Sequence, residues 1–266
     1  MARPAESGYA PVDGVLVYWE SRGAGGTPLL LVHGGYGVTS EFDALAGPWS
    51  RDRRVIAIEL EGHGHTRASG RPFRWETFGD AVAGVITHLG LGQVDLLGYS
   101  LGGGASLRCA IQHPELVRNL ILISAPHRRD AWFPEVRAAF DGMSAGSLFE
   151  MLRHSPVYAA WQKVAPDQDS FPALIDFNGD LLRQPYDWSA EVAALPVPVM
   201  LVYADADSIS PAAAAEFFGL LGGGQRDANW DGSLRPASRL AILPGQTHYD
   251  MLAAPSLPQI VASFTG

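Results

Sequence analysis

Six short apolar runs constrain the fold of this chain more than any other feature. They lie at residues 29–32, 55–58, 94–97, 120–123, 199–203 and 240–243. Apolar runs of this length without polar alternation are typical of strands buried on both faces, as in a parallel sheet. Parallel neighbours need crossover connections, usually helices. Between the second and third runs, Phe78, Val82, Val85, Ile86 and Leu89 share one helical face. The pattern therefore predicts a doubly wound α/β fold.

The N-terminal part of the chain carries a different signal. Val12 and Val15 flank Asp13-Gly14, a dipeptide that strongly favours a tight β-hairpin turn. We expect two antiparallel strands there, ending near Glu20. Together with the six runs they predict a mostly parallel sheet of eight strands with an antiparallel start. Ligands of such sheets bind beyond the carboxyl ends of the parallel strands.

Residues 127–188 interrupt the alternation of strand and helix. Aromatic and methionine side chains recur there, but no strand-like run appears. We interpret this segment as a helical insertion into a single core formed by residues 1–126 and 189–266. The length of 266 residues and the 47% content of hydrophobic residues suffice for one such core. A second irregular stretch, residues 222–236, is rich in Gly, Asp and Asn and predicts a long loop.

Charge and cysteine content argue against several classes of function. A formal net charge of −9, with Lys163 as the single lysine, is unlike a surface that binds nucleic acid. Cys109 is the only cysteine, which excludes an internal disulfide and a thiolate cluster for a metal. No nucleotide, flavin or metal motif is present, so we expect no cofactor.

The first seven residues show no secretory-signal pattern, and the apolar runs are too short to span a bilayer. We expect a soluble, cytoplasmic protein with no membrane partner, acting on a small molecule.

The strongest candidate for chemistry is Ser100. It lies in Gly98-Tyr99-Ser100-Leu101-Gly102, between the apolar run at 94–97 and a helix-compatible segment ending near Gln112. A serine at a tight strand-to-helix turn is forced outward above the sheet, and the crowded backbone on both sides favours glycine. The helix that follows directs the positive end of its dipole at charge developing near the serine. This pattern indicates a nucleophilic serine.

A serine hydroxyl needs a neighbouring base to take its proton. Among the eight histidines, His248 follows the final predicted strand, where its ring can reach Ser100 across the carboxyl end of the sheet. The imidazole in turn needs a carboxylate on its other nitrogen. Asp205 and Asp207 both follow the run at 199–203; we favour Asp207, because it lies deeper in the loop, before Pro211 opens the next helix. The chain order serine, acid, histidine agrees with a hydrolase of this sheet type.

A second loop can supply the groups that stabilise an oxyanion. His33-Gly34-Gly35-Tyr36-Gly37 follows the apolar run at 29–32. In acyl transfer the attacked carbonyl becomes an oxyanion, which backbone N–H donors stabilise. We assign these donors to Gly35 and Leu101, with Tyr36 as the alternative one position along. For His33 we expect a structural role that holds this loop.

Together these motifs resemble the α/β-hydrolase superfamily, and the resemblance extends over nearly the whole chain. Residues 59–66 resemble the family's Asp-x-Arg-Gly-x-Gly-x-Ser turn, although Glu61 stands where arginine is usual and Thr66 where serine is usual. The resemblance implies that residues 127–188 form a lid over the pocket and select the substrate. Its aromatics imply an apolar acyl or ring-containing substrate. The candidate substrate contacts are Tyr36, Tyr99, Trp132, Phe140 and Trp161.

The resemblance also sets the functional alternatives. Ser100 excludes the epoxide hydrolase and haloalkane dehalogenase chemistries of relatives that have aspartate at this turn. Hydrolysis of a carboxylic ester or lactone through an acyl-enzyme is the favoured function. C–C bond hydrolysis and cofactor-free haloperoxidase or perhydrolase activity use the same three residues and remain open. A ligand-binding protein that kept the fold without catalysis is the remote alternative.

Overall fold

A computed structural model describes residues 6–266 of the chain. It begins with an antiparallel hairpin of β1 (Glu6–Val12) and β2 (Val15–Arg22), in which Val12 pairs with Val15. Asp13 and Gly14 have φ values of 46° and 81°, as a two-residue turn with positive φ at both positions requires. The predicted hairpin is thus confirmed. The first five residues lie outside the described residues. The expectation that the chain starts without a secretory signal rests partly on them and stays a prediction.

The hairpin is part of one eight-stranded sheet with the order β1-β2-β4-β3-β5-β6-β7-β8. β2 pairs with β4 in antiparallel fashion, and all later pairs are parallel. The fold class predicted from the apolar runs is therefore confirmed. The six strands that follow the hairpin are β3 (Leu29–Val32), β4 (Val55–Ile58), β5 (Val94–Tyr99), β6 (Val117–Ile123), β7 (Val199–Ala206) and β8 (Arg239–Thr247).

Alternate residues of the central strands face two separate apolar layers. Leu30 and Val32 belong to the cluster that contains α2 and α3, whereas Leu29 and Leu31 belong to the cluster that contains α1 and α10. This is the two-sided burial that the apolar runs predict. The expectation is wrong for β8, in which only Leu243 is buried. β8 ends the sheet, so one of its sides has no neighbouring strand to cover it.

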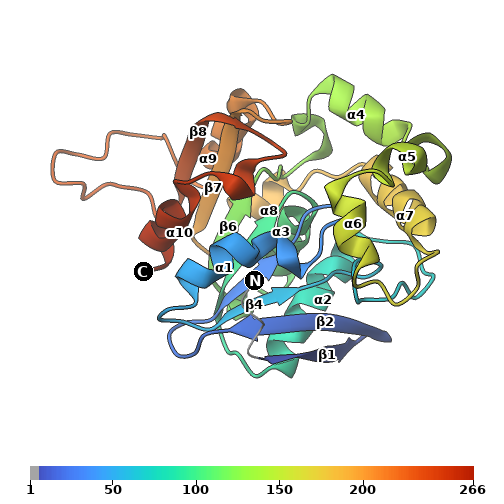
Figure 1. Cartoon of the computed structure of the whole chain (residues 1–266). Helices are drawn as coiled ribbons and strands as arrows, with labels where there is room; N and C mark the ends of the chain where they lie inside the picture. The colour runs from blue at the N-terminus through green and yellow to red at the C-terminus, as the bar shows by residue number, and fades with distance from the viewer. Residues whose placement is uncertain (1–5) are drawn as a thin grey trace.

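Helices cover both faces of the sheet (Figure 1). α2 confirms the predicted helical pattern, because Phe78, Val82, Val85 and Ile86 are all buried in it. The helices of the body are η1 (Thr39–Phe42), α1 (Asp43–Trp49), α2 (Trp75–His88), α3 (Leu101–Gln112), η2 (Pro114–Leu116), α8 (Ser189–Ala193), α9 (Pro211–Leu220), η4 (Met251–Ala253) and α10 (Leu257–Thr265). No helix in residues 6–266 has the length and apolar character that a membrane crossing requires.

Residues 127–188 contain helices and no strand, and Figure 1 shows these helices gathered on one side of the molecule. The two ends of the segment meet: the Trp188 N–H donates to the His127 carbonyl oxygen at 3.0 Å, and Arg128 forms an antiparallel bridge with Asp187. The chain therefore leaves and re-enters the body at one place. The helices of the segment are η3 (Arg129–Ala131), α4 (Pro134–Asp141), α5 (Ala145–Leu152), α6 (Pro156–Gln162) and α7 (Phe171–Arg183).

Residues 222–236 contain no helix or strand, in agreement with the loop predicted there. In Figure 1 this loop is drawn in orange and extends away from the body between α9 and β8. Trp230 within it is 94% exposed, so the loop contributes little to the core.

Candidate active site

Ser100 forms the turn between β5 and α3. Its backbone has φ 52° and ψ −116°, a conformation that is strained for any residue with a Cβ. The Ser100 N–H donates to the Ile123 carbonyl oxygen at 2.9 Å, and its carbonyl oxygen accepts from the Gly104 N–H at 3.1 Å. These two bonds hold the strained turn between strand and helix.

Close backbone contacts explain the glycines on either side of Ser100. A Cβ at Gly98 would lie 2.3 Å from the Gly102 carbonyl oxygen, and a Cβ at Gly102 would lie 2.3 Å from the His33 carbonyl oxygen. The Gly102 oxygen belongs to α3 and the His33 oxygen to the loop directly after β3, so a methyl group at either glycine would displace backbone. The glycine pattern of the sequence therefore reflects the packing of β5, α3 and the loop after β3.

The structure brings Ser100, His248 and Asp207 together. The Ser100 Oγ lies 2.9 Å from the His248 Nε2, and the His248 Nδ1 lies 2.9 Å from the Asp207 Oδ1. Because an ionised carboxylate only accepts hydrogen bonds, Nδ1 carries the proton in the neutral ring and Nε2 can accept from the serine. The Tyr99 hydroxyl donates to the His248 carbonyl oxygen at 2.5 Å and fixes the loop that follows β8.

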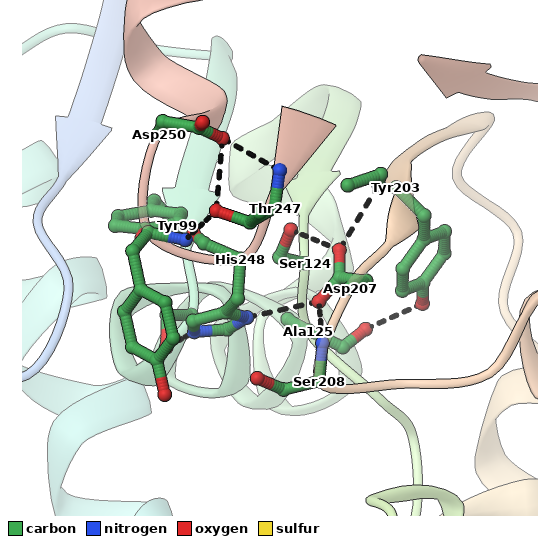
Figure 2. Close-up of polar contacts among 12 residues, drawn as sticks. Tyr99, Ser124, Ala125, Tyr203, Asp207, Ser208, Thr247, His248 and Asp250 are labelled. Carbon is green, nitrogen blue, oxygen red and sulfur yellow. Dashed lines mark hydrogen bonds and ion pairs between the residues drawn. The ribbon is translucent and has the colours of Figure 1, made fainter. Parts of the chain in front are cut away.

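The Asp207 carboxylate is held from several sides (Figure 2). Its Oδ2 accepts from the Ser124 hydroxyl at 2.6 Å and from the Ala204 N–H at 3.0 Å, and its Oδ1 accepts from the Ser208 N–H at 2.7 Å. Burial by itself raises the pKa of this carboxyl, but the hydrogen bonds with His248, Ser124 and Ala204 outweigh it and hold the pKa below its ordinary value. Asp207 is therefore ionised at neutral pH.

The alternative acid, Asp205, has another contact. It is the penultimate residue of β7, is exposed, and accepts from the Gly245 N–H at 2.9 Å. The structure thus places Asp207, and not Asp205, beside the imidazole.

The two predicted amide donors lie beside Ser100. Gly35 and Leu101 line the same cavity as Ser100 and His248. Neither amide has a hydrogen-bond acceptor within residues 6–266, so both are free to bind a ligand oxygen. Tyr36, the alternative donor, has a φ of 63° in the next position of the loop.

His33 holds this loop, as expected from its position. Its Nδ1 donates to the Gly34 carbonyl oxygen at 2.7 Å, and its Nε2 accepts from the Leu60 N–H at 3.1 Å. Burial lowers the pKa of His33, which keeps the ring neutral. Both ring nitrogens are occupied, so His33 is a structural residue.

Comparison with known proteins agrees with the observed fold. Residues 27–153 match the family model described as alpha/beta hydrolase fold. The crystal structure of E-2-(acetamidomethylene)succinate hydrolase superposes with a TM-score of 0.75 at 21% identity, covering 97% of this chain and 98% of that one. The family match and the structural likeness together show that this chain has the α/β-hydrolase fold.

Two curated relatives match this chain over very different lengths. The pimeloyl-[acyl-carrier protein] methyl ester esterase of Nitrosomonas europaea is 26% identical over 90% of this chain and 94% of its own length. The 2-hydroxymuconate semialdehyde hydrolase of Pseudomonas sp. (strain CF600) is 38% identical, over 38% of this chain and 37% of its own length. Across six relatives with 34% to 42% identity, the chain spans only 32% to 42% of the relative's length.

The turn that departs from the α/β-hydrolase pattern has structural partners. Glu59 is fully buried and accepts from the backbone N–H groups of Thr39 and His65 at 3.0 Å and 2.5 Å. Glu61, in place of the usual arginine, accepts from the Ser69 N–H at 2.8 Å and pairs with Arg71 at 3.2 Å. Both carboxylates thus hold the backbone around this turn.

A cavity of about 350 Å³ opens beside Ser100 and His248. Four of the five predicted substrate contacts line it: Tyr36, Tyr99, Trp132 and Phe140. Trp132 and His248 make an edge contact with ring centroids 5.5 Å apart, which places the indole next to the imidazole.

The fifth predicted contact, Trp161, does not line the cavity. Its ring is 1% exposed and packs against Tyr158 and Phe171, with centroid distances of 5.9 Å and 4.9 Å. Helix α6 turns this side chain into the core that the insertion shares with the body. The prediction of substrate contact at Trp161 is therefore wrong.

Several cavity residues were not expected from the sequence. Glu41, Trp75, Met143, Asn178 and Tyr186 come from η1, α2 and the insertion, and none belongs to a recognised motif. Ser124 was also missed; its position directly after β6, at the carboxyl end of the sheet, was the available signal. None of the cavity residues in the described part of the chain is Lys or Arg.

Proposed function

We propose that this chain is a serine hydrolase that cleaves a carboxylic ester or lactone through an acyl-enzyme intermediate. The observation that supports this most is the continuous contact from Ser100 Oγ through the His248 ring to the Asp207 carboxylate, with both contacts at 2.9 Å. Nucleophile, base and orienting acid in this geometry are the requirements for acyl transfer.

In the proposed reaction Ser100 Oγ bonds to the substrate carbonyl carbon while His248 Nε2 takes its proton. The ionised Asp207 stabilises the imidazolium that forms. The carbonyl oxygen becomes an oxyanion, which the Gly35 and Leu101 amides stabilise. His248 then returns the proton to the leaving alcohol. Water, activated by the same histidine, releases the acyl group and regenerates the serine.

Hydrolysis of a C–C bond is the second candidate, because the name of one relative, 2-hydroxymuconate semialdehyde hydrolase, denotes such a substrate class. That name also denotes a carboxylate-bearing substrate. A buried carboxylate needs a cationic partner, and the lining of this cavity, within residues 6–266, has no Lys or Arg. The charge of the cavity therefore favours an ester or lactone without a carboxylate.

Substrate assays with a serine variant test the proposal. Short p-nitrophenyl esters and lactones should be hydrolysed by the natural chain, whereas Ser100→Ala should reduce turnover by at least about 10³-fold with an unchanged circular dichroism spectrum. Assays with vinylogous diketones, and with peroxide and halide, cover the C–C and perhydrolase alternatives. Ester turnover that survives in Ser100→Ala would refute the assignment. A folded natural chain inactive on every one of these substrates would favour a non-catalytic ligand-binding protein.

A further inference from the structure

Glu41 is a carboxyl group of the cavity that the proposed mechanism does not use. It lies in η1, directly after the loop that carries Gly35, and it lines the cavity together with Tyr99, Ser100 and His248. Its Oε2 accepts from the Gly34 N–H at 3.0 Å. Gly34 also lies next to the strand-to-helix turn at Ser100, because a Cβ at Gly34 would lie 3.7 Å from the Ser100 Cβ. Glu41 and the reacting atoms thus line the same cavity.

The second oxygen of Glu41 has no partner. Oε1 makes no hydrogen bond or ion pair within residues 6–266. It is also not one of the fully buried polar atoms that lack a partner, so it remains accessible. Glu41 as a whole is partly buried. One carboxylate oxygen therefore anchors the loop, while the other is available to a ligand in the cavity.

Glu41 has no permanently cationic partner in the walls of the cavity, as far as the structure describes the chain. The lining within the described residues has no Lys or Arg. Burial raises the pKa of Glu41 to about 7, and the Gly34 N–H offsets only part of that effect. The Gly34 N–H thus compensates the Glu41 carboxylate only in part, and a cationic ligand would supply the remainder.

The walls of the cavity also suit a cation. Seven of the twenty lining residues are Trp, Tyr or Phe, among them Tyr99, Trp132 and Tyr249. Aromatic faces attract ammonium groups through the ring quadrupole, most strongly where water is excluded. A carboxylate combined with aromatic walls is a favourable environment for an organic ammonium ion.

We propose that Glu41 and the surrounding aromatic rings select substrates that carry an ammonium group near the scissile bond. This inference rests on the proposed ester hydrolysis for its role in catalysis, but the binding of the cation does not depend on turnover. It makes Glu41 a specificity-determining residue: its Oε1 faces the cationic group, while Oε2 keeps the loop of Gly35 in place.

Matched ligands test the cation preference. Acetylthiocholine and S-(3,3-dimethylbutyl) thioacetate have nearly the same shape, but only the first carries a permanent positive charge. At about pH 8, where Glu41 is ionised, we expect the natural chain to show kcat/KM about tenfold higher for acetylthiocholine. Glu41→Gln keeps an acceptor for the Gly34 N–H and should bring the ratio of the two kcat/KM values close to one.

Binding of phenyltrimethylammonium, measured by calorimetry, gives a readout that needs no activity. We expect its Kd to rise about tenfold in Glu41→Gln. Glu135→Gln is the control, because Glu135 is an exposed residue of α4 outside the cavity and its loss changes the net charge equally. It should leave both the substrate ratio and the Kd unchanged.

The outcomes separate this inference from the proposed function. Ester hydrolysis without a preference for the charged thioester, or a preference that persists in Glu41→Gln, would overturn the role of Glu41 and leave the hydrolase assignment intact. Phenyltrimethylammonium that binds the natural chain and Glu41→Gln equally would overturn it as well. Absence of any ester turnover together with Glu41-dependent binding of the cation would instead refute the hydrolase and keep the cation site.

Discussion

At the scale of single residues, the Asp207 carboxylate controls the histidine. It accepts the His248 Nδ1–H and is itself held by the Ser124 hydroxyl. Asp207→Asn keeps the shape but favours the wrong imidazole tautomer, because an amide can donate to Nδ1. We expect kcat for a p-nitrophenyl ester to fall by about 10³–10⁴-fold. Asp205→Asn, which affects only the contact with Gly245, should stay within about twofold of the natural chain. An equal loss in both variants would contradict the assignment.

The raised pKa of Glu41 predicts a dependence of stability on pH. Its ordinary value of 4.5 rises to about 7 in the folded chain, so the folded state holds the proton more tightly than the unfolded state does. The favourable contribution is complete below about pH 4.5 and is lost as pH rises to about 7, where the free energy of unfolding has fallen by a few kcal/mol at most.

Glu41→Gln removes this titration. Urea unfolding at several pH values should show that the difference in stability between Glu41→Gln and the natural chain shifts in favour of the variant between about pH 4.5 and 7. A difference that stays constant over this range would show that Glu41 titrates at its ordinary pKa.

The residues with a motif were predictable, and those without one were not. Ser100, His248 and Asp207 each follow a strand at the carboxyl edge, and this position identifies them in the sequence. Glu41 and Trp75 reach the cavity only through the packing of η1 and α2. The aromatic content of the insertion indicated which kind of residue lines the cavity, but not the rotation of α6, which directs Trp161 into the core.

At the scale of secondary structure, the turn at Ser100 depends on the close packing of β5, α3 and the loop after β3. A Cβ at Gly102 would meet the carbonyl oxygens of Val32 and His33 at 2.4 Å and 2.3 Å. We expect Gly102→Ala to lower the free energy of unfolding by about 2–4 kcal/mol, because backbone must shift to admit the methyl group.

Gly219→Ala is the matched control for this substitution. Gly219 lies in α9, and its Cβ would have only an ordinary contact at 3.8 Å with Gln225. Alanine favours helix at such a position, so this variant should be as stable as the natural chain or up to about 1 kcal/mol more stable in urea unfolding. Equal destabilisation by both substitutions would indicate that the turn at Ser100 is not tightly packed.

Strand positions followed from the apolar runs, but strand ends did not. β5 continues through Gly98 and Tyr99, and β7 continues through Asp205, because hydrogen-bond pairing persists beyond the apolar residues. The burial of β8 was also not predictable from its sequence. Its short apolar run resembles the runs of the central strands, although β8 lies at the edge of the sheet. Burial on one or two faces depends on the neighbouring strands, which a local pattern does not contain.

At the scale of the whole molecule, the site requires segments that are far apart in the sequence. Ser100 and His248 are separated by 148 positions, and His248 and Asp207 by 41. The insertion packs into the same apolar cluster as the sheet, through Trp161, Phe171 and Ile175. Its residues Trp132, Phe140 and Met143 line the cavity beside Ser100. The order of the strands in the sheet brings the three loops together at one edge.

Covalent labelling with a fluorophosphonate tests most directly whether these segments form a reactive centre. An activated serine attacks the phosphorus and displaces fluoride, and intact-mass spectrometry measures the adduct. We predict one adduct per chain, located on Ser100 by peptide mapping, with no labelling of Ser100→Ala and little of Asp207→Asn. A folded chain that takes up no fluorophosphonate, or that is labelled equally after Ser100→Ala, would contradict the account.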